Sequence, residues 1–553
     1  MKKILSIVIS ILFMTTSCSK MLDEYNPGGV TADAVYTTPA GFESLVSAAY
    51  GYQRMWYGKE EGYNISEIGT DIWTSAAGDI GPDMSKYINF QGTSGIIKLQ
   101  WGALYQGVNL CNAGIKLIGK AGLSDAKRKQ LEGELRFLRA FYNWHIVETW
   151  GGVHFTTEET NGIVTTANKT PVETFYTQIF EDLQIAVANL APTTSDYGRV
   201  TKPAAMSFLA RMYLTRGMNA EALAMAKSVI DGGFGYQLQP DYKDLWTMAN
   251  NHNKEVVYAV NYANDLTFND LNHSGVYTIG HGRGSNSGHM MFDMKYDNLP
   301  RMARIIEYGR PFNRYMPTRA LLQMYSSDDA RYEASFREVW MACTSANGKP
   351  TAGGWSISGD TAVIATRTTY AGMPSKVGKT TGYVVYNINT IYKADGSVNN
   401  MLVYPTLTKH EDPTRLTYNE AQSEREAFVI RFAELYMIAA EASMKLNDNA
   451  TAATYINVIR TRAAKPGKVA EMQITPAQVT LDFILDERAR EFAGEQLRWF
   501  DLKRTGKLVD RIKALNPDAA PNIQAYHNLR PIPQSQLDAV TNPDEFKQNE
   551  GYQ

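Results

Sequence analysis

Glutamates recur at helical spacing near the carboxyl end of the chain, and two such carboxylates could act as the acid and base of a glycosidase. Glu487, Glu491 and Glu495 are four residues apart, and arginines stand between them. Carboxylates one helical turn apart point the same way, and neighbouring arginines keep both ionised. A general acid needs a raised pKa, whereas this setting lowers it. We therefore predict a structural lattice of ion pairs, and we interpret Glu434 and Glu441, two turns apart, in the same way.

Three histidines, His273, His281 and His289, stand eight residues apart in a glycine-rich stretch, which invites a metal-site interpretation. Eight-residue spacing fits neither a helix face nor a zinc ribbon, and no cysteines accompany the histidines. We expect ordinary loop or ligand-facing histidines and no cofactor. A structural calcium ion stays open, but no residue pattern indicates one. No Gly-x-Ser-x-Gly elbow marks a Ser-His-Asp site.

Aromatic residues beside polar ones provide the parts that carbohydrate binding needs. A flat ring buries the C–H face of a pyranose, while Asp, Asn, Arg or Gln binds its hydroxyls. Asp71 and Trp73 combine both kinds in a predicted loop, and Tyr277 and Trp355 lie in Gly- and Ser-containing stretches further on. We predict these four residues as ligand contacts. The alternative, that Trp73 is a core or hinge residue and the other rings pack locally, stays open.

The amino-terminal segment predicts export and membrane attachment. Residues 1–17 contain two lysines, a short apolar run and small residues, and Cys18 follows directly. This order is typical of a secretory signal, and the apolar run is too short to span a bilayer. We predict a lipoprotein signal peptide over 1–17, lipidation of Cys18 and a flexible tether over 18–31.

Charge and cysteine content narrow the remaining function classes. Removal of residues 1–17 takes away Lys2 and Lys3 and leaves 53 basic and 57 acidic side chains, a net charge of −4. This balance argues against a nucleic-acid partner, which would require a basic patch. Besides Cys18 the chain has Cys111 and Cys343, which we expect to be buried thiols, although one disulfide between them stays open.

Helical patterns occupy about residues 32–235 and 420–512. Thr38 and Thr170, each followed by proline, predict capped helix starts, and Glu173 would complete a capping box with Thr170. Residues 206–230 and 436–459 look like two copies of one helix–turn–helix unit, with turns at Asn219 and Asn449 and alanines where the helices touch. This pattern is typical of tetratricopeptide-like pairs.

Residues of about 236–419 interrupt the helical pattern with loops and strand-like runs such as 361–368 and 382–392. We predict a mostly α single domain over 32–553, in which this loop- and short-strand-rich insertion holds the ligand. A coil-rich tail follows residue 512.

Several blocks together resemble the RagB/SusD family of outer-membrane lipoproteins. They are residues 133–144 leading to 150–153, 199–205, 431–442, 456–462, 484–506, 529–534 and 549–552, in the order that the family has. The resemblance covers nearly the whole mature chain.

The resemblance implies a helical domain on tetratricopeptide-like units and no catalysis. It also implies a cell-surface glycan-binding protein of the outer membrane, whose partner is a SusC-like TonB-dependent transporter that it covers like a lid. Family members often carry a ligand-stacking tryptophan where this chain has Trp73. Some similar proteins serve peptide uptake, so capture of peptides or another nutrient stays open as the alternative.

Overall fold

Helices dominate both ends of the chain. The computed structural model describes residues 32–160, 162–263, 265, 285–344, 356–369 and 382–553. The longer helices are α3 (Pro39–Gly51), α6 (Gly95–Leu117), α7 (Asp125–Trp150), α8 (Val172–Asn189), α9 (Lys202–Thr215), α10 (Asn219–Ile230), α15 (Phe432–Lys445), α16 (Asn449–Ala463), α18 (Leu481–Phe492) and α20 (Leu508–Leu515). The shorter ones are α2 (Ala32–Tyr36), α4 (Glu60–Ser66), α5 (Pro82–Ser85), α11 (Gly288–Met291), α12 (Arg319–Met324), α13 (Arg331–Ser335), α14 (Ile388–Ile391), α17 (Val469–Met472), α19 (Arg498–Arg504) and α21 (Gln534–Leu537).

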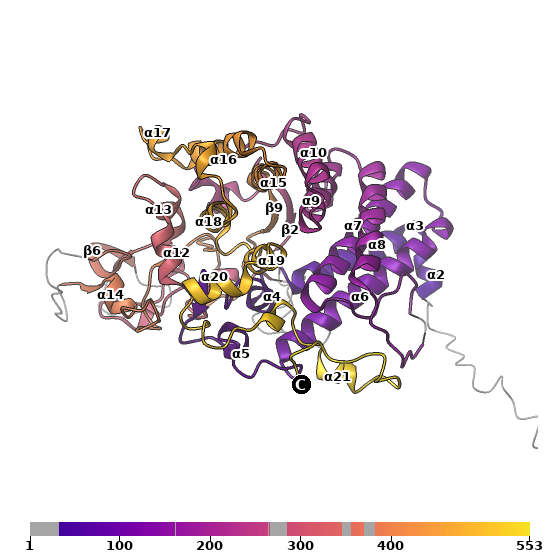
Figure 1. Cartoon of the computed structure of the whole chain (residues 1–553), viewed down its shortest axis with the longest axis horizontal. Helices are drawn as coiled ribbons and strands as arrows, with labels where there is room; N and C mark the ends of the chain where they lie inside the picture. Colours follow the sequence, from indigo (N-terminus) through magenta and orange to yellow (C-terminus); the bar gives the residue numbers. More distant parts are fainter. Residues whose placement is uncertain (1–31, 161, 264, 266–284, 345–355, 370–381) are drawn as a thin grey trace, which may run out of the picture.

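The two predicted helix–turn–helix units are the pairs α9–α10 and α15–α16. Their second helices begin at Asn219 and Asn449, where the sequence places the turns. Buried alanines such as Ala205, Ala226 and Ala440 let the helices approach closely. Because α10 packs on α15, the two pairs join the halves of the chain into one helical scaffold (Figure 1). The prediction of a mostly α fold on tetratricopeptide-like pairs is confirmed.

Local signals account for several helix boundaries. Thr38 caps α3 by accepting a hydrogen bond from the Gly41 N–H. The α7 helix ends at Trp150 and is capped by Gly151, whose φ of 75° favours a residue without a Cβ. The predicted cap at Thr170 is wrong, because α8 begins one residue later with Pro171 as its N-cap and no side-chain capping bond. Proline disfavours helical geometry in the residue before it.

Within the described part of the chain, short strands of the insertion and its flanking segments form four small sheets. Antiparallel pairs join β1 (Trp73–Ser75) to β3 (Tyr315–Pro317), β2 (Val256–Val260) to β9 (Ala427–Arg431) and β4 (Phe336–Arg337) to β8 (Thr406–Leu407). The fourth sheet has the order β5 (Val339–Thr344), β6 (Ser356–Ala365), β7 (Val384–Tyr386), with a parallel β6–β7 pair. The last sheet lies with α12, α13 and α14 on the left of Figure 1, away from the long helices α6, α7 and α8.

The insertion shares its core with the helices. One cluster of buried apolar side chains includes Phe42 from α3, Phe292 and Trp340 from the insertion, and Tyr552 from the tail. Cys111 and Cys343 are buried free thiols, which confirms that expectation. Within the described ranges, no helix combines the length and the apolar character that crossing a membrane requires.

Candidate ligand-binding site

Asp71, a predicted ligand contact, is fully buried in an ion pair between distant parts of the chain. Its carboxylate accepts hydrogen bonds from Arg498 at 2.7 and 2.6 Å and from the Arg511 Nε at 2.7 Å. Burial opposes ionisation, but the two guanidinium groups still lower the pKa of Asp71 below its usual value. The structure therefore corrects the ligand assignment, because this carboxylate is occupied by arginines and has no exposed surface.

Trp73 is also a core residue in this structure. It opens β1, and its side chain is fully buried with its ring centroid 4.7 Å from that of Phe292. A sugar ring can stack only on an exposed aromatic face, so the predicted platform at Trp73 is wrong here. The cause is the pairing of β1 with β3, which draws Trp73 inward.

Other predicted residues lie outside the described part of the chain. These are Cys18, Tyr277 and Trp355, together with His273 and His281, and they stay predictions. His289 is described and faces the interior, with its Nε2 3.4 Å from the Glu420 carbonyl oxygen. Burial lowers its pKa to about 3, so the ring is a neutral core group and the ligand-facing interpretation is wrong for this histidine. The described residues contain no cluster of three potential metal ligands.

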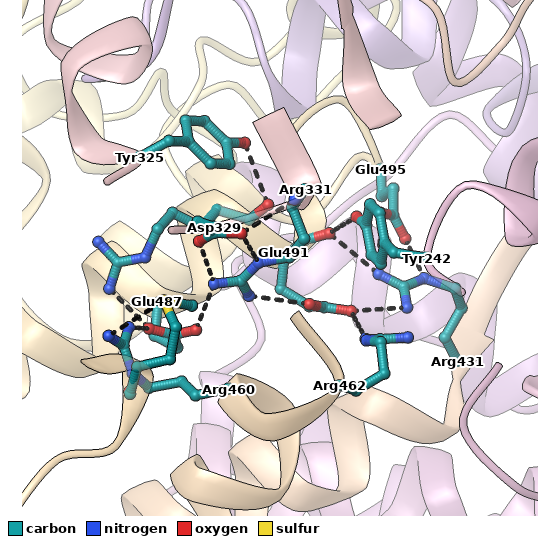
Figure 2. Close-up of polar contacts among 12 residues, drawn as sticks. Tyr242, Tyr325, Asp329, Arg331, Arg431, Arg460, Arg462, Glu487, Glu491 and Glu495 are labelled. Atoms are coloured by element: carbon teal, nitrogen blue, oxygen red, sulfur yellow. Dashed lines mark hydrogen bonds and ion pairs between the residues drawn. The ribbon is translucent and has the colours of Figure 1, made fainter. Parts of the chain in front are cut away.

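The carboxylates on and just beyond α18 form the predicted ion-pair lattice. Figure 2 shows Glu487, Glu491 and Glu495 surrounded by guanidinium groups from several segments. All three carboxylates are largely or fully buried. Their partners are the cations Arg331, Lys409, Arg431, Arg460, Arg462 and Arg490, at N···O distances of 2.5–3.0 Å.

This lattice fixes the protonation state of its carboxylates. Burial alone would raise their pKa, but the surrounding cations lower the pKa of Glu487, Glu491 and Glu495 below the usual value. Glu434 and Glu441 likewise pair with Arg211 and Arg504, at 2.7 and 2.6 Å. The predicted lattice is confirmed, and none of its three glutamates has the raised pKa of a general acid.

An open hollow of about 480 Å³ lies where the loop-rich insertion meets the β1 segment. We call it the β1–β3 hollow, because one part of its wall comes directly after β1 in the sequence and another part comes directly before β3. Its polar, charged and aromatic lining residues are Lys295, Asn298, Arg304, Arg310, Phe312, Asn313 and Arg314. The chain therefore continues from Asp71 and Trp73 to Ala77 and Gly78 in the wall of this hollow. The side chains of Asp71 and Trp73 themselves are buried in the core.

Backbone contacts fix the shape of the β1–β3 hollow. The Gly78 N–H donates to the Asn313 carbonyl at 2.7 Å, and the Lys295 N–H donates to the Leu402 carbonyl at 3.0 Å. A Cβ on Gly78 would lie 2.1 Å from the Phe312 carbonyl oxygen, so only glycine permits this approach. Main-chain bonds therefore hold the wall, together with the Arg314 guanidinium, which donates to the Gly78 carbonyl oxygen.

Phe312 and the arginines beside it are the ligand-type residues that sequence reasoning missed. The guanidinium carbons of Arg310 and Arg314 lie 5.0 and 5.1 Å from the Phe312 ring centroid. The side chain of Asn298 is exposed at the same hollow. The signal was the run 309–314, in which glycine, proline, asparagine and arginines surround one aromatic residue.

Two further hollows flank Tyr197, whose exposed fraction is 37%. They measure about 390 and 410 Å³ and share the loop that contains Tyr197. The ring of Tyr197 stacks on His252 with a centroid distance of 3.8 Å. This stacked pair is an exposed aromatic surface that the sequence analysis did not single out.

Comparison with known proteins identifies the family. A family model described as "SusD family" matches residues 226–552, more than half of the chain. The chain belongs to the SusD family. A second model, described as "Starch-binding associating with outer membrane", matches residues 68–214. The resemblance seen in the sequence is thereby confirmed.

Similarity to individual SusD-family proteins extends over nearly the full length. The chain is 24% identical over 527 residues to starch-binding protein SusD of Bacteroides thetaiotaomicron, covering 89% of this chain and 85% of that one. It is also 24% identical over 564 residues to SusD-like protein P25 of Formosa agariphila, covering 96% and 95%.

Solved structures of SusD-like proteins share the fold. A laminarin-binding SusD-like protein superposes with a TM-score of 0.70 at 21% identity, covering 93% of this chain and all of that one. Surface glycan-binding protein A of Bacteroides thetaiotaomicron, in complex with laminarihexaose, gives 0.67 at 20% identity, covering 93% and 99%.

Proposed function

We propose that this SusD-family protein is a non-enzymatic glycan-binding lipoprotein of the cell surface. It captures oligo- or polysaccharide and delivers it to a SusC-like TonB-dependent transporter in the outer membrane. Lipid on Cys18 anchors it to that membrane, facing the exterior. Support for the membrane comes from the second family description, and support for the anchor comes from residues 1–18.

The β1–β3 hollow is the observation that carries the proposal. Its volume of about 480 Å³ falls within the roughly 300–1,000 Å³ that small-molecule sites occupy. It combines an aromatic ring, Phe312, with amide and guanidinium donors from Asn298 and Arg310. These are the groups that bind the C–H face and the hydroxyls of a sugar. The names of relatives that bind starch and laminarin point to the same class of ligand.

Binding at such a site selects a sugar by shape and by the direction of its hydroxyls. Open sites of this kind bind weakly, at about micromolar to millimolar Kd, or roughly −8 to −4 kcal/mol. The tether over 18–31 offsets weak binding, because attachment to the membrane raises the effective concentration of sites beside the transporter.

Calorimetric titration of the mature protein with plant, host and fungal glycans tests the proposal. We expect at least one polysaccharide to bind, and Phe312→Ala to weaken that binding. Tyr526→Ala is a matched control, because Tyr526 is an exposed aromatic residue that does not line the hollow. Tyr197→Ala tests whether the two hollows beside Tyr197 contribute to glycan binding.

Two outcomes would overturn the proposed function. Binding of peptides in the absence of any glycan binding would favour the alternative cargo. New reducing ends after incubation with a polysaccharide would show catalysis, which the proposal excludes.

A further inference from the structure

The β1–β3 hollow presents an excess of positive charge. Lys295, Arg304, Arg310 and Arg314 all line it, and none of the described residues that line it is a carboxylate. Neutral sugars need hydrogen-bonding groups of both kinds but no net charge. Four cations around one open hollow therefore suggest a charged ligand.

Nearby carboxylates compensate only part of this charge. Asp297 pairs with both Lys295 and Arg304, at 2.9 and 2.7 Å. Glu60 pairs with Arg314 at 2.6 Å. Two carboxylates thus serve three of the four cations.

Among the described residues, Arg310 is the lining cation that no hydrogen-bond acceptor or carboxylate pairs with, although its guanidinium lies over the Phe312 ring. It makes no hydrogen bond or ion pair with any described residue, and its Nε is buried without an acceptor. Burial and the neighbouring cations Arg304 and Arg415 lower the pKa of its guanidinium below the usual value. A partly desolvated charge beside like charges is unfavourable, and a bound anion would remove this cost.

The side-chain geometry favours an oxyanion on a sugar. A guanidinium is a planar donor fork that matches carboxylate and sulfate groups. The Arg310 guanidinium carbon lies over the Phe312 ring, 5.0 Å from its centroid, so a cation and an apolar ring are adjacent in the hollow. An acidic sugar presents the same combination, a charged group on a ring with a C–H face.

We propose that the β1–β3 hollow binds an acidic saccharide, one whose sugars carry carboxylate or sulfate groups, and that Arg310 pairs with the charged group. The inference rests on the proposed glycan-binding function and narrows its ligand class. It separates this chain from its relatives named for starch and laminarin, because those glucans carry no charge.

Matched pairs of polysaccharides test the charge preference directly. Polygalacturonate and its methyl ester share a backbone and differ in carboxylate charge, while carrageenan and agarose compare sulfated with uncharged galactans. Calorimetry with the mature protein should give at least tenfold tighter binding to one charged member than to its neutral counterpart. That preference should shrink as salt screens the interaction. The two pairs distinguish carboxylate from sulfate.

Arg310→Met tests the assigned residue, since it removes the charge and keeps an apolar side chain. The preference for the charged member over its neutral counterpart should fall about tenfold, equivalent to about 1.4 kcal/mol. The melting temperature of Arg310→Met should equal or exceed that of the wild type, because the substitution removes an uncompensated charge. Arg128→Met is the control, since Arg128 is an exposed arginine outside the hollow.

The outcomes separate this inference from the proposed function. Equal binding of charged and neutral members, unaffected by Arg310→Met, would overturn the inference and leave glycan binding intact. Absence of binding to every polysaccharide would overturn both. Binding of poly-glutamate with no polysaccharide binding would overturn the saccharide assignment in favour of an acidic peptide.

Discussion

Asp71→Asn should destabilise the protein without affecting its ligand binding. The carboxylate of Asp71 accepts three hydrogen bonds from Arg498 and Arg511, at 2.6–2.7 Å. An asparagine removes the negative charge and leaves the buried Arg498 without a carboxylate partner. Removal of one partner from a buried ion pair costs about 3–5 kcal/mol. An unfolding entropy of about 2.1 cal/mol/K per residue gives roughly 1.2 kcal/mol/K for this chain, so the melting temperature should fall by about 3–4 °C.

Differential scanning calorimetry of the wild type, Asp71→Asn and Asp544→Asn measures this effect. Asp544 is the matched control, because its side chain is fully exposed and its ion pair with Lys547 is long, at 3.7 Å. Its replacement should change stability by less than about 0.5 kcal/mol. Glycan titration well below the melting temperature should give wild-type affinity for both variants.

The opposite pattern would refute the reasoning. If Asp71→Asn has the melting temperature of the wild type but does not bind glycan, then Asp71 contacts the ligand. The conclusion that Asp71 is a buried structural residue would then be wrong.

Three further predictions concern acid stability, thiol reactivity and anchoring. Stability should fall as pH drops below about 4.5, because the surrounding cations hold the pKa values of the α18 lattice glutamates below their usual value. Above that pH the effects oppose each other, because burial lowers the pKa of His145 to about 3 and raises the pKa of Glu67 to about 8. Thermal melts between about pH 5 and 3 measure the acid-side loss. Cys111 and Cys343 should react with a thiol reagent only after denaturation, since both are buried. Cys18→Ser should move the protein from the membrane fraction to the soluble fraction without lowering its melting temperature.

Each of these predictions has a contradicting result. A melting temperature that is constant or rises as the pH drops below about 4.5 would contradict the protonation states assigned to the α18 lattice glutamates. Fast modification of a thiol in the native protein would contradict its burial. Retention of Cys18→Ser at the membrane would show that lipid on Cys18 is not the anchor.

The sequence predicted those parts of the fold that local signals determine. Helix periodicity and small residues at the pair interfaces located α9–α10 and α15–α16, including the starts at Asn219 and Asn449. The alternation of glutamates and arginines around Glu487 and Glu491 predicted the ion-pair lattice, because side chains one turn apart share a helix face. The basic partners from distant segments, such as Arg331, could not be assigned from spacing.

The site was harder to predict, because burial depends on contacts between distant segments. Trp73 has the composition of a ligand-binding loop around it, but its pairing with Pro317 in β3 places it in the core. Conversely, Phe312 and Arg310 line a hollow only because the segment before β3 lies against Gly78. Neither contact leaves a periodic pattern in the sequence.

A crystal structure of the protein with its tightest-binding oligosaccharide tests the central claim most directly. We expect sugar density in the β1–β3 hollow, with a ring against Phe312 and a polar or charged group within hydrogen-bond distance of Arg310. Sugar density confined to the Tyr197 surface or to another face, with the β1–β3 hollow empty, would contradict it.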